Sequence, residues 1–244
     1  MADHDARGVR GQPLSRLSRD VVIRYALAQI DEGGLSGLSM RNLAKTLRVE
    51  AMSLYRYVNG REDLLEGIVD LLLHDLTPAM RDAQRGQWQR FFQVTAHEVR
   101  RIAIDHPRAF PLVATRHPAA PWLRPPLRSV EVVEIFLGTL IEYGFTDQQA
   151  VDAYRSFSSF LLGQLLLESA VRGADTSPDD EPLDEGGADV PQRDGTRRLV
   201  DLPHVSRLRD LLSEDRAEEE FEVTLEALLD RLDRELSRDG GRAR

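Results

Sequence analysis

The sequence predicts an all-α protein, with a small amino-terminal helical module followed by a larger helical domain. Apolar residues recur at three- and four-residue spacing along most of the chain, which is the period of helices with one buried face. Beyond residue 78, no convincing run alternates in the way that a half-buried strand requires. The length of 244 residues leaves room for both parts.

The first predicted helix runs from Ser18 to Glu32. Its apolar residues fall on one face, which consists of Val22, Ile23, Ala26, Leu27 and Ile30. Gly33 and Gly34 then end the helix, because glycine adopts at little cost the left-handed conformation that terminates helices. This helix offers a face against which the next two helices can pack.

Two short helices joined by a tight turn are predicted between residues 39 and 61. Ser39 can cap the first helix with its hydroxyl group. After a turn at residues 48–50, the second helix runs over residues 51–58 and ends at residues 59–60, Asn-Gly. The buried face of the pair is apolar and consists of Leu43, Ala44, Leu47, Leu54 and Val58.

The exposed side of this helix pair carries side chains suited to DNA. Hydroxyl, phenol and guanidinium groups can bind phosphates, and the first turn of a recognition helix meets base edges in the major groove. We expect phosphate contacts from Ser39, Arg41, Tyr55, Tyr57 and Arg61, and base contacts from Met52, Ser53 and Arg56. Met40 and Ala51 complete the candidate DNA-binding surface. Taken alone, these residues leave an ordinary solvated surface open as the alternative.

The order of motifs in this region is that of a known family. It comprises the first helix with its double glycine, Leu38-Ser39-Met40-Arg41, Leu54-Tyr55, Tyr57-Val58 and Asp63-Leu64-Leu65. Over about fifty residues the chain resembles the DNA-binding domain of the TetR family of bacterial transcriptional regulators. The resemblance implies a helix-turn-helix DNA-binding domain over residues 18–63, with a connecting helix over residues 61–77.

One position departs from the family pattern. The family usually has glycine in the turn where this chain has Arg48. A left-handed conformation at a non-glycine residue costs about 1 kcal/mol or more. Either the turn is shaped differently here, or the strain is accepted because Arg48 gains a phosphate contact.

Charge is divided unevenly along the chain. Residues 1–61 contain ten Arg or Lys against six Asp or Glu, whereas the remaining residues contain 22 against 35. An acidic remainder discourages nonspecific wrapping, so DNA contacts should be confined to the amino-terminal module. Residues 1–17 form a flexible basic leader with Arg7, Arg10 and Arg16. The leader could follow the DNA backbone or a minor groove, or it could be a disordered tail.

The rest of the chain, residues 78–244, is predicted as one helical ligand-binding and dimerisation domain. Its predicted helices cover residues 87–104, 107–116, 127–143, 147–171, 205–212 and 217–236. Residues 173–195 contain eight acids, four glycines and three prolines. Such a segment cannot bury enough apolar surface to fold by itself, so we expect a mobile acidic loop there.

Two of these helices have apolar faces that are broad enough to need a partner. They lie near residues 147–171 and 217–238, and Gly163 allows another backbone to approach the first of them. Pairing each helix with its copy gives a four-helix bundle around a two-fold axis, so we expect a homodimer. The alternative is that both faces belong to the core of one subunit. A single recognition helix would read too few bases for useful specificity, which favours the dimer.

Motifs after residue 78 extend the resemblance to the tetracycline repressor branch of the family. They are Trp88-Gln89, Arg100-Arg101, Ala114-Thr115-Arg116, Tyr143-Gly144-Phe145-Thr146 and residues 160–163. The resemblance implies a ligand cavity in each subunit, whose occupation rotates the connecting helix and separates the two DNA-binding heads. Matching positions place eight residues around that cavity: Thr95, Val99, Leu112, Arg116, Val133, Phe136, Val151 and Tyr154.

The same resemblance argues against a magnesium–tetracycline complex. Where that branch has histidines, this chain has Thr77 and either Leu112 or Val113, and the acidic position reads Leu167 with Glu168 beside it. An apolar pocket with few polar groups would suit a largely hydrophobic, partly anionic or hydroxylated small molecule. The expected polar groups are those of Thr95, Arg116 and Tyr154.

The expected function is that of a ligand-responsive DNA-binding regulator, a repressor that leaves a palindromic operator when a small molecule binds. A sequestering helical protein without operator function and a ligand-dependent activator remain as alternatives. No enzyme is expected, because the histidines lie far apart, no nucleophile motif is recognisable and the chain has no cysteine. We therefore expect no catalytic residue, no metal and no cofactor. No apolar run suggests a membrane span or a secretory signal, so we expect a cytoplasmic protein.

Overall fold

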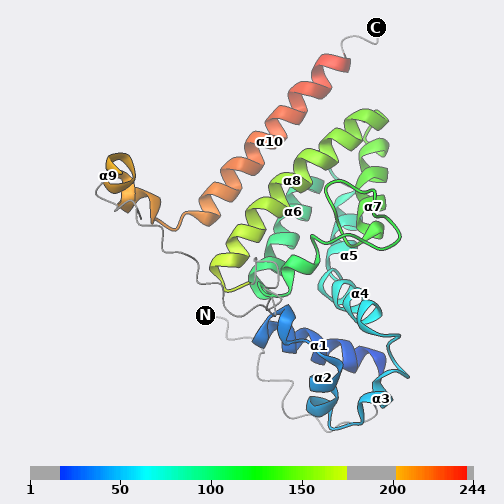
Figure 1. The fold of residues 1–244 in the computed structure, drawn as a ribbon. Helices are drawn as coiled ribbons and strands as arrows, with labels where there is room; N and C mark the ends of the chain where they lie inside the picture. The colour runs from blue at the N-terminus through cyan, green and yellow to red at the C-terminus, as the bar shows by residue number, and fades with distance from the viewer. Residues whose placement is uncertain (1–16, 175–201, 241–244) are drawn as a thin grey trace. The chain divides into compact units, whose positions relative to one another are not determined.

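A computed structural model describes residues 17–174 and 202–240, and these residues are helical without a strand (Figure 1). The chain divides into two compact units, residues 1–176 and 177–244. Within the described part of the first unit, the α-helices are α1 (Arg19–Gly33), α2 (Met40–Leu47), α3 (Ala51–Leu54), α4 (Arg61–Leu72), α5 (Leu76–Ala83), α6 (Trp88–Asp105), α7 (Val130–Glu142) and α8 (Asp147–Val171). Two short 3₁₀ helices, η1 (Leu35–Gly37) and η2 (Phe110–Leu112), connect them.

Helices α1 to α4 form the amino-terminal end of this unit (Figure 1). Ser18 caps α1 by accepting a hydrogen bond from the backbone N–H of Val21, and the predicted apolar face of α1 is buried. Helix α4 packs closely on α1 at Gly67, where a β-carbon would lie 2.4 Å from Cδ1 of Ile23. The absence of a side chain at Gly67 therefore permits the close contact between these helices.

The recognition pair is present, but its second helix is shorter than predicted. Helix α3 ends at Leu54, and residues 55–57 continue as turns. The backbone N–H groups of Arg56 and Tyr57 reach the carbonyls three residues back rather than four. Aromatic and β-branched residues in this segment are weak helix formers, which agrees with the early end. Val58 nevertheless remains buried as the pattern predicted.

The connecting helix is interrupted. A single helix over residues 61–77 was expected, but α4 ends at Leu72 and α5 begins at Leu76. Pro78 explains the break, because a proline inside a continuous helix has no N–H to donate and clashes with the carbonyl four residues earlier. Restarting the helix at Leu76 places Pro78 in a first turn, where its missing donor costs nothing.

The core between α5 and α8 is rich in aromatic rings. Phe92 is fully buried, and its ring centroid lies 5.2 Å from that of Phe136 on α7 and 4.9 Å from that of Phe157 on α8. Trp88 and Phe91 make further edge contacts with Phe92. These rings join α6, α7 and α8 into one layer of packed side chains.

Prolines shorten two predicted elements between α6 and α8. Only residues 110–112 of the predicted 107–116 helix are helical, as η2, with turns on either side. Helix α7 begins at Val130 rather than near residue 127, after Pro125 and Pro126 and the capping residue Ser129. Pro107 and Pro111 supply no N–H for helical hydrogen bonds in the first segment, and the hydroxyl of Ser129 caps α7 by accepting from the backbone N–H of Val132.

In the second unit, the described residues form α9 (Pro203–Leu212) and α10 (Ala217–Gly240). The buried residues of α10 are Phe221, Leu225, Leu229 and Leu232, which belong to the predicted stripe. The expected mobile loop at residues 173–195 lies almost wholly outside the described residues, as does the basic leader apart from residue 17. None of the described helices has both the length and the apolar character that crossing a membrane requires.

Candidate DNA-binding surface and ligand pocket

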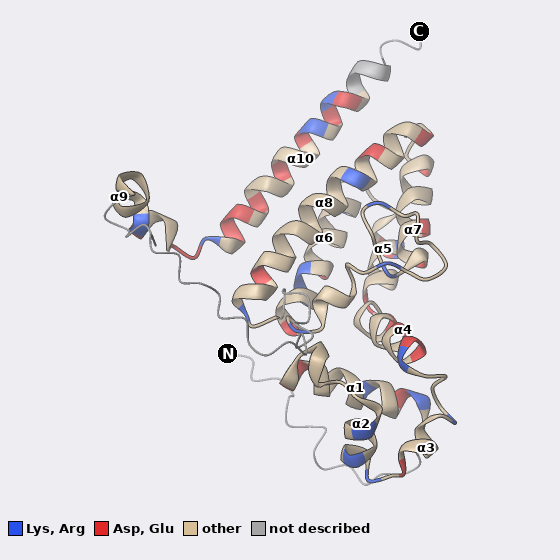
Figure 2. Ribbon diagram, in the orientation of Figure 1, with Lys and Arg blue, Asp and Glu red and all other residues tan. Residues whose placement is uncertain are grey.

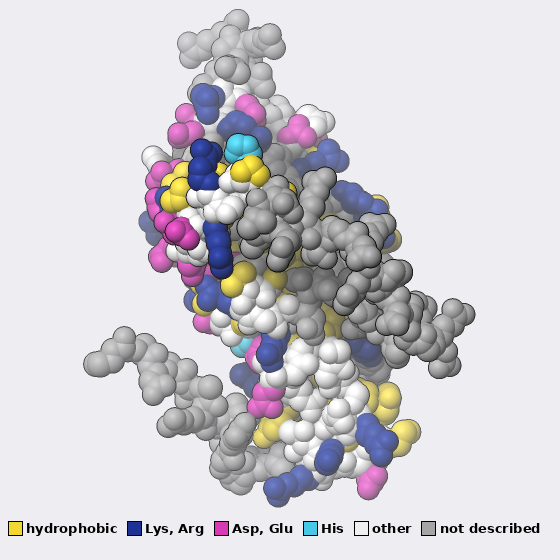
Figure 3. Space-filling view, turned by 60° about the vertical axis from the view of Figure 1, so that its left-hand side comes forward, with side chains coloured by type: hydrophobic (Ala, Val, Ile, Leu, Met, Phe, Trp, Pro, Cys, Tyr) yellow, Lys and Arg dark blue, Asp and Glu magenta, His cyan; other side chains and the backbone are white. Residues whose placement is uncertain are grey.

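The candidate DNA-binding residues lie together on the surface of α2, α3 and the turns beside them. Met52 and Tyr55 are 76% and 48% exposed. Arg41, Arg56 and Arg61 are also exposed. The half-buried members are Met40, Ala51, Ser53 and Tyr57, whereas Ser39 is exposed and caps α2 through Asn42. Basic side chains are spread over this end of the first unit (Figures 2 and 3).

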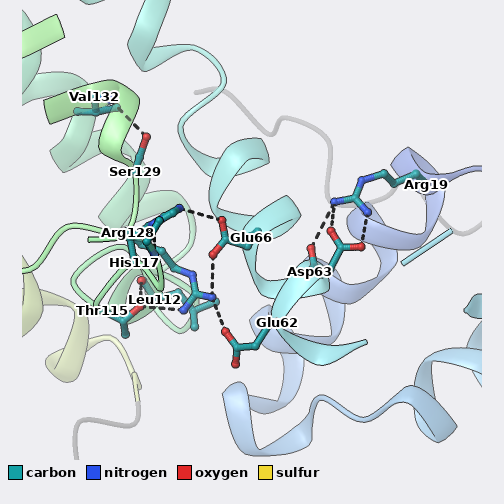
Figure 4. Close-up of polar contacts among 11 residues, drawn as sticks. Arg19, Glu62, Asp63, Glu66, Leu112, Thr115, His117, Arg128, Ser129 and Val132 are labelled. Atoms are coloured by element: carbon teal, nitrogen blue, oxygen red, sulfur yellow. Dashed lines mark hydrogen bonds and ion pairs between the residues drawn. The ribbon is translucent and has the colours of Figure 1, made fainter. Parts of the chain in front are cut away.

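An ion pair fixes this surface to α1. The guanidinium of Arg19 donates to both carboxylate oxygens of Asp63, at 2.9 and 2.6 Å, and also to the carbonyl of Tyr57 at 3.1 Å. The backbone N–H of Asn59 donates to Asp63 at 2.7 Å. Hydrogen bonds from Arg19 and Asn59 lower the pKa of Asp63, so this carboxyl is ionised at neutral pH. The turn between α3 and α4 is therefore held by one carboxylate (Figure 4).

The turn between α2 and α3 contains a strained residue. Arg48 has φ 56° and ψ 42°, which is the left-handed helical conformation, and its backbone N–H donates to the carbonyl of Lys45. Of the two alternatives left by the sequence, the structure shows the strained one. Arg48 is exposed.

Replacing Arg48 with glycine should raise the free energy of unfolding by about 1 kcal/mol, because glycine adopts this conformation without the β-carbon penalty. The matched control is Arg48→Ala, which removes the same guanidinium but keeps the penalty. Urea unfolding of both variants measures the difference. Equal stability of the two variants would show that strain at residue 48 is negligible.

An apolar pocket lies within the first unit between α5, α6, α7, α8, the turn after α4 and the segments before α7. Its empty space measures about 460 Å³, including the part open to solvent. The lining residues are Leu73, Leu76, Val99, Val113, Leu127, Val132, Val133, Phe136, Tyr154, Phe157, Ser158, Leu161 and Leu162. A largely apolar pocket with few polar groups is the usual form of a small-molecule site.

Tyr154 and Ser158 are the two lining residues that bear polar side-chain groups. The hydroxyl of Tyr154 donates to the backbone carbonyl of Pro125 at 3.0 Å. Burial raises the pKa of Tyr154 to about 12, against a hydrogen bond with Ser158 that lowers it. The phenol is therefore neutral at physiological pH and remains a hydrogen-bond donor.

Four of the eight residues that the resemblance assigned to a cavity line this pocket, namely Val99, Val133, Phe136 and Tyr154. The other four do not. Thr95 is buried, but its hydroxyl donates to the carbonyl of Phe91 in its own helix. Arg116 is exposed, Val151 is half-buried, and Leu112 is buried beside the lining residue Val113. The guanidinium of Arg116, which the resemblance placed in the cavity, is therefore not part of the pocket lining.

The lining residues do not fit a magnesium ion. None of them carries a carboxylate or an imidazole, the oxygen and nitrogen ligands that a protein would offer to such a complex. Leu167, which stands at the position that is acidic in the tetracycline repressor branch, is apolar and 72% exposed. Glu168 is buried, but its Oε1 accepts hydrogen bonds from Arg100 at 3.2 Å and Arg172 at 2.7 Å.

A cluster of charges connects the segment before α7 with α4, and sequence reasoning missed it. The buried guanidinium of Arg128 bonds to Glu62 and Glu66, and Nε2 of His117 lies 3.3 Å from Glu66 (Figure 4). One signal was available, since Glu62 and Glu66 are four residues apart and share a helix face. Their partner is 62 residues away from the nearer of them, and nothing in local periodicity could identify it.

A second contact joins the end of α1 to the end of α6. Nδ1 of His106 lies 2.9 Å from Oδ2 of Asp31, and this hydrogen bond raises the pKa of His106. Arg108 donates to the carbonyl of Asp31 from the same side. The amino-terminal helices are thus held to the core at two separate points, one on α1 and one on α4.

Comparison with known proteins identifies related chains. Residues 80–236 match the family model described as tetracyclin repressor-like, C-terminal domain. The tetracycline repressor protein class E of Escherichia coli is 31% identical over 157 residues, which cover 64% of this chain and 71% of that protein. A solved structure described as a possible TetR family transcriptional regulator from Streptomyces coelicolor A3(2) has a TM-score of 0.66 and 26% identity, covering 88% of this chain and 98% of the other. ActR from Streptomyces coelicolor, solved in complex with actinorhodin, shares the fold with a TM-score of 0.62 and 22% identity over 89% of this chain and 96% of its own.

Proposed function

Because the chain belongs to the TetR family of transcriptional regulators, we propose that it is a repressor released from a palindromic operator when a small molecule enters the pocket. Residues 18–63 are the DNA-binding head, α4 and α5 connect it to the rest, and residues 78–244 bind the ligand and form the dimer. The ten candidate DNA-binding residues named above make the operator contacts.

One observation carries this proposal. The head presents Met52, Tyr55 and Arg56 to solvent at the helix that reads bases in such a motif, although large apolar side chains are normally buried. Exposed apolar and aromatic side chains beside several exposed arginines support a nucleic-acid-binding surface. The same chain carries an apolar pocket lined by Leu73, the residue directly after α4, which is the helix that follows the recognition helix.

The pocket's chemistry defines a class of ligand. Apolar side chains with aromatic rings from Phe136 and Phe157 favour a largely hydrophobic molecule. Tyr154 and Ser158 would orient it through hydrogen bonds. A charged ligand is disfavoured, because the lining residues supply no opposite charge and burial of an unpaired charge is costly. The complex of ActR with actinorhodin gives a precedent for small-molecule binding by this fold.

A homodimer would form through α8 and α10. The single chain leaves Leu167 and Val171 of α8 exposed at 72% and 91%, and Val223 of α10 at 59%. A β-carbon added at Gly163 would meet no atom within 4 Å, so that point of α8 is free for a neighbouring backbone. A two-fold dimer would meet operator half-sites about 34–36 Å apart.

Two arginine variants test the DNA-binding assignment. Arg56→Ala should weaken binding to the operator by about 1–3 kcal/mol, with little effect on random DNA, if Arg56 pairs with a guanine. Arg41→Ala should weaken binding to both DNAs alike, because a phosphate contact carries no sequence information. Fluorescence anisotropy titrations at one stated salt concentration measure both affinities.

Each variant serves as the control for the other. Equal losses on both DNAs for Arg56→Ala would reduce Arg56 to a phosphate contact. An operator-selective loss for Arg41→Ala would contradict its assigned role. If the wild-type protein selects no sequence at all, a protein that sequesters a small molecule becomes the better account of the pocket.

A further inference from the structure

Arg128 is a buried cation that joins the segment before α7 to α4. Its side chain is 6% exposed, and its Nη2 donates to Oε2 of Glu62 at 2.8 Å and to Oε1 of Glu66 at 3.2 Å (Figure 4). Its Nη1 lies 3.3 Å from the hydroxyl oxygen of Thr115. Both carboxylates come from the first two turns of α4.

The face of α4 that Arg128 meets is acidic. Glu62, Glu66 and Asp70 follow one another at four-residue spacing, which places them on one side of the helix. Partial burial and then the charge of nearby Glu66 raise the pKa of Asp70, and like charges at this spacing repel one another. Arg128 supplies the buried positive charge that holds this face against the core.

The segment that carries Arg128 also forms a wall of the pocket. The backbone N–H of Arg128 donates to the carbonyl of Val113 at 3.0 Å, and both Val113 and Leu127 line the pocket. Three residues before Arg128, the carbonyl of Pro125 accepts the hydrogen bond from Tyr154. One short segment therefore bonds to the pocket residue Tyr154 through Pro125 and to the carboxylates of α4 through Arg128.

We propose that Arg128 is the positioning residue through which the pocket determines the position of α4. An uncharged ligand acts by offering its own acceptor oxygen to Tyr154. The inference deepens the proposed function and rests on it, because α4 matters for DNA only as the helix that follows α3. A ligand that takes the Tyr154 hydroxyl releases the carbonyl of Pro125. The segment up to Arg128 then shifts, and α4 follows, since separating a buried guanidinium from its carboxylates would cost more than moving both.

The experiment measures the distance between the head and the core in the ligand-free protein. The chain has no cysteine, so Lys45→Cys on α2 and Glu134→Cys on α7 can carry spin labels at two exposed positions. Excess unlabelled protein restricts the measurement to pairs within one chain. Arg128→Met should shift or broaden the distance distribution, because it frees α4 from the core. Tyr154→Phe should shift the distribution, because it removes the bond that a ligand would take.

Two further variants protect the result from misfolding. Glu62→Gln with Glu66→Gln removes the same ion pairs from the more exposed side, and should reproduce the shift of Arg128→Met. Arg124→Met is the matched control, because Arg124 is an exposed arginine of the same segment that donates to the carbonyls of Pro121 and Leu123. It should leave the distance unchanged.

Operator affinity provides the second readout. The variants that shift the distance should lose about tenfold in affinity for the operator, the size of an ordinary allosteric coupling. Wild-type distances in both Arg128→Met and the double glutamine variant would overturn the inference, whatever the DNA result. A wild-type protein that selects no DNA sequence would instead defeat the proposed function, and the distances would still decide whether Arg128 positions α4.

Discussion

Replacing Phe92 with alanine should lower the free energy of unfolding by about 3–5 kcal/mol, the usual cost of removing a fully buried phenylalanine. The Phe92 side chain has no exposed surface, and its ring contacts those of Trp88, Phe91, Phe136 and Phe157. The substitution removes the ring that joins α6 to α7 and α8 and leaves a cavity that side chains from three helices cannot fill. Urea unfolding followed by circular dichroism measures the loss.

An exposed aromatic residue provides the control. Trp122 is 74% exposed, and Trp122→Ala should change the free energy of unfolding by no more than about 0.5 kcal/mol. A loss below about 1 kcal/mol for Phe92→Ala would mean that the aromatic layer is not the core of the larger domain.

Replacing Asp63 with alanine should cost about 2 kcal/mol of stability, because the charged partner of two separate donors is lost. The guanidinium of Arg19 and the backbone N–H of Asn59 would both lose this carboxylate, and the turn that precedes α4 would be freed from α1. Operator affinity should fall as well, since the recognition helix lies directly before that turn. Unfolding and anisotropy titrations measure the two effects.

The contribution of Asp63 should depend on pH in a defined direction. The pKa of Asp63 is lowered in the folded protein, first by Arg19 and then by Asn59. Its stabilisation is therefore fully present above the unfolded pKa, near 4, and is lost as the pH falls through the lower folded value. The difference between wild type and Asp63→Ala should be constant at neutral pH and shrink in acid.

A surface ion pair within α1, the helix that carries Arg19, is the comparison for Asp63. Asp20 pairs with Arg24 four residues away, and both side chains are more than half exposed. Asp20→Ala should cost at most about 0.5 kcal/mol. If Asp63→Ala costs no more than Asp20→Ala, the carboxylate does not fix the turn.

Local patterns were sufficient to predict most helices and the head. The cap at Ser39 and the apolar faces of the first two helices depend on neighbours within four residues, and the structure has both. Pro111 lies inside the predicted 107–116 helix and could have limited that prediction, because proline's effect on a helix interior is also local. The left-handed turn at Arg48 could not be decided, since its cost is offset by contacts elsewhere.

The pocket was predicted less completely than the head. A resemblance transfers helix faces, so it found Val133, Phe136 and Tyr154 on α7 and α8. Arg116 does not line this pocket; prolines leave the segment between α6 and α7 with little helix, and periodicity gives no direction there. Arg128 was missed for the same reason, as its partners on α4 lie more than sixty residues away.

The most direct test of the central claim is a selection of genomic DNA by the purified protein, unfolded and refolded beforehand to remove bound small molecules. The protein should enrich a two-fold symmetric sequence whose half-sites are centred about 10–10.5 base pairs apart or a multiple of that spacing. The Arg56→Ala variant should lose that enrichment. No enriched sequence from a protein that is folded would contradict the assignment of this chain as an operator-binding repressor.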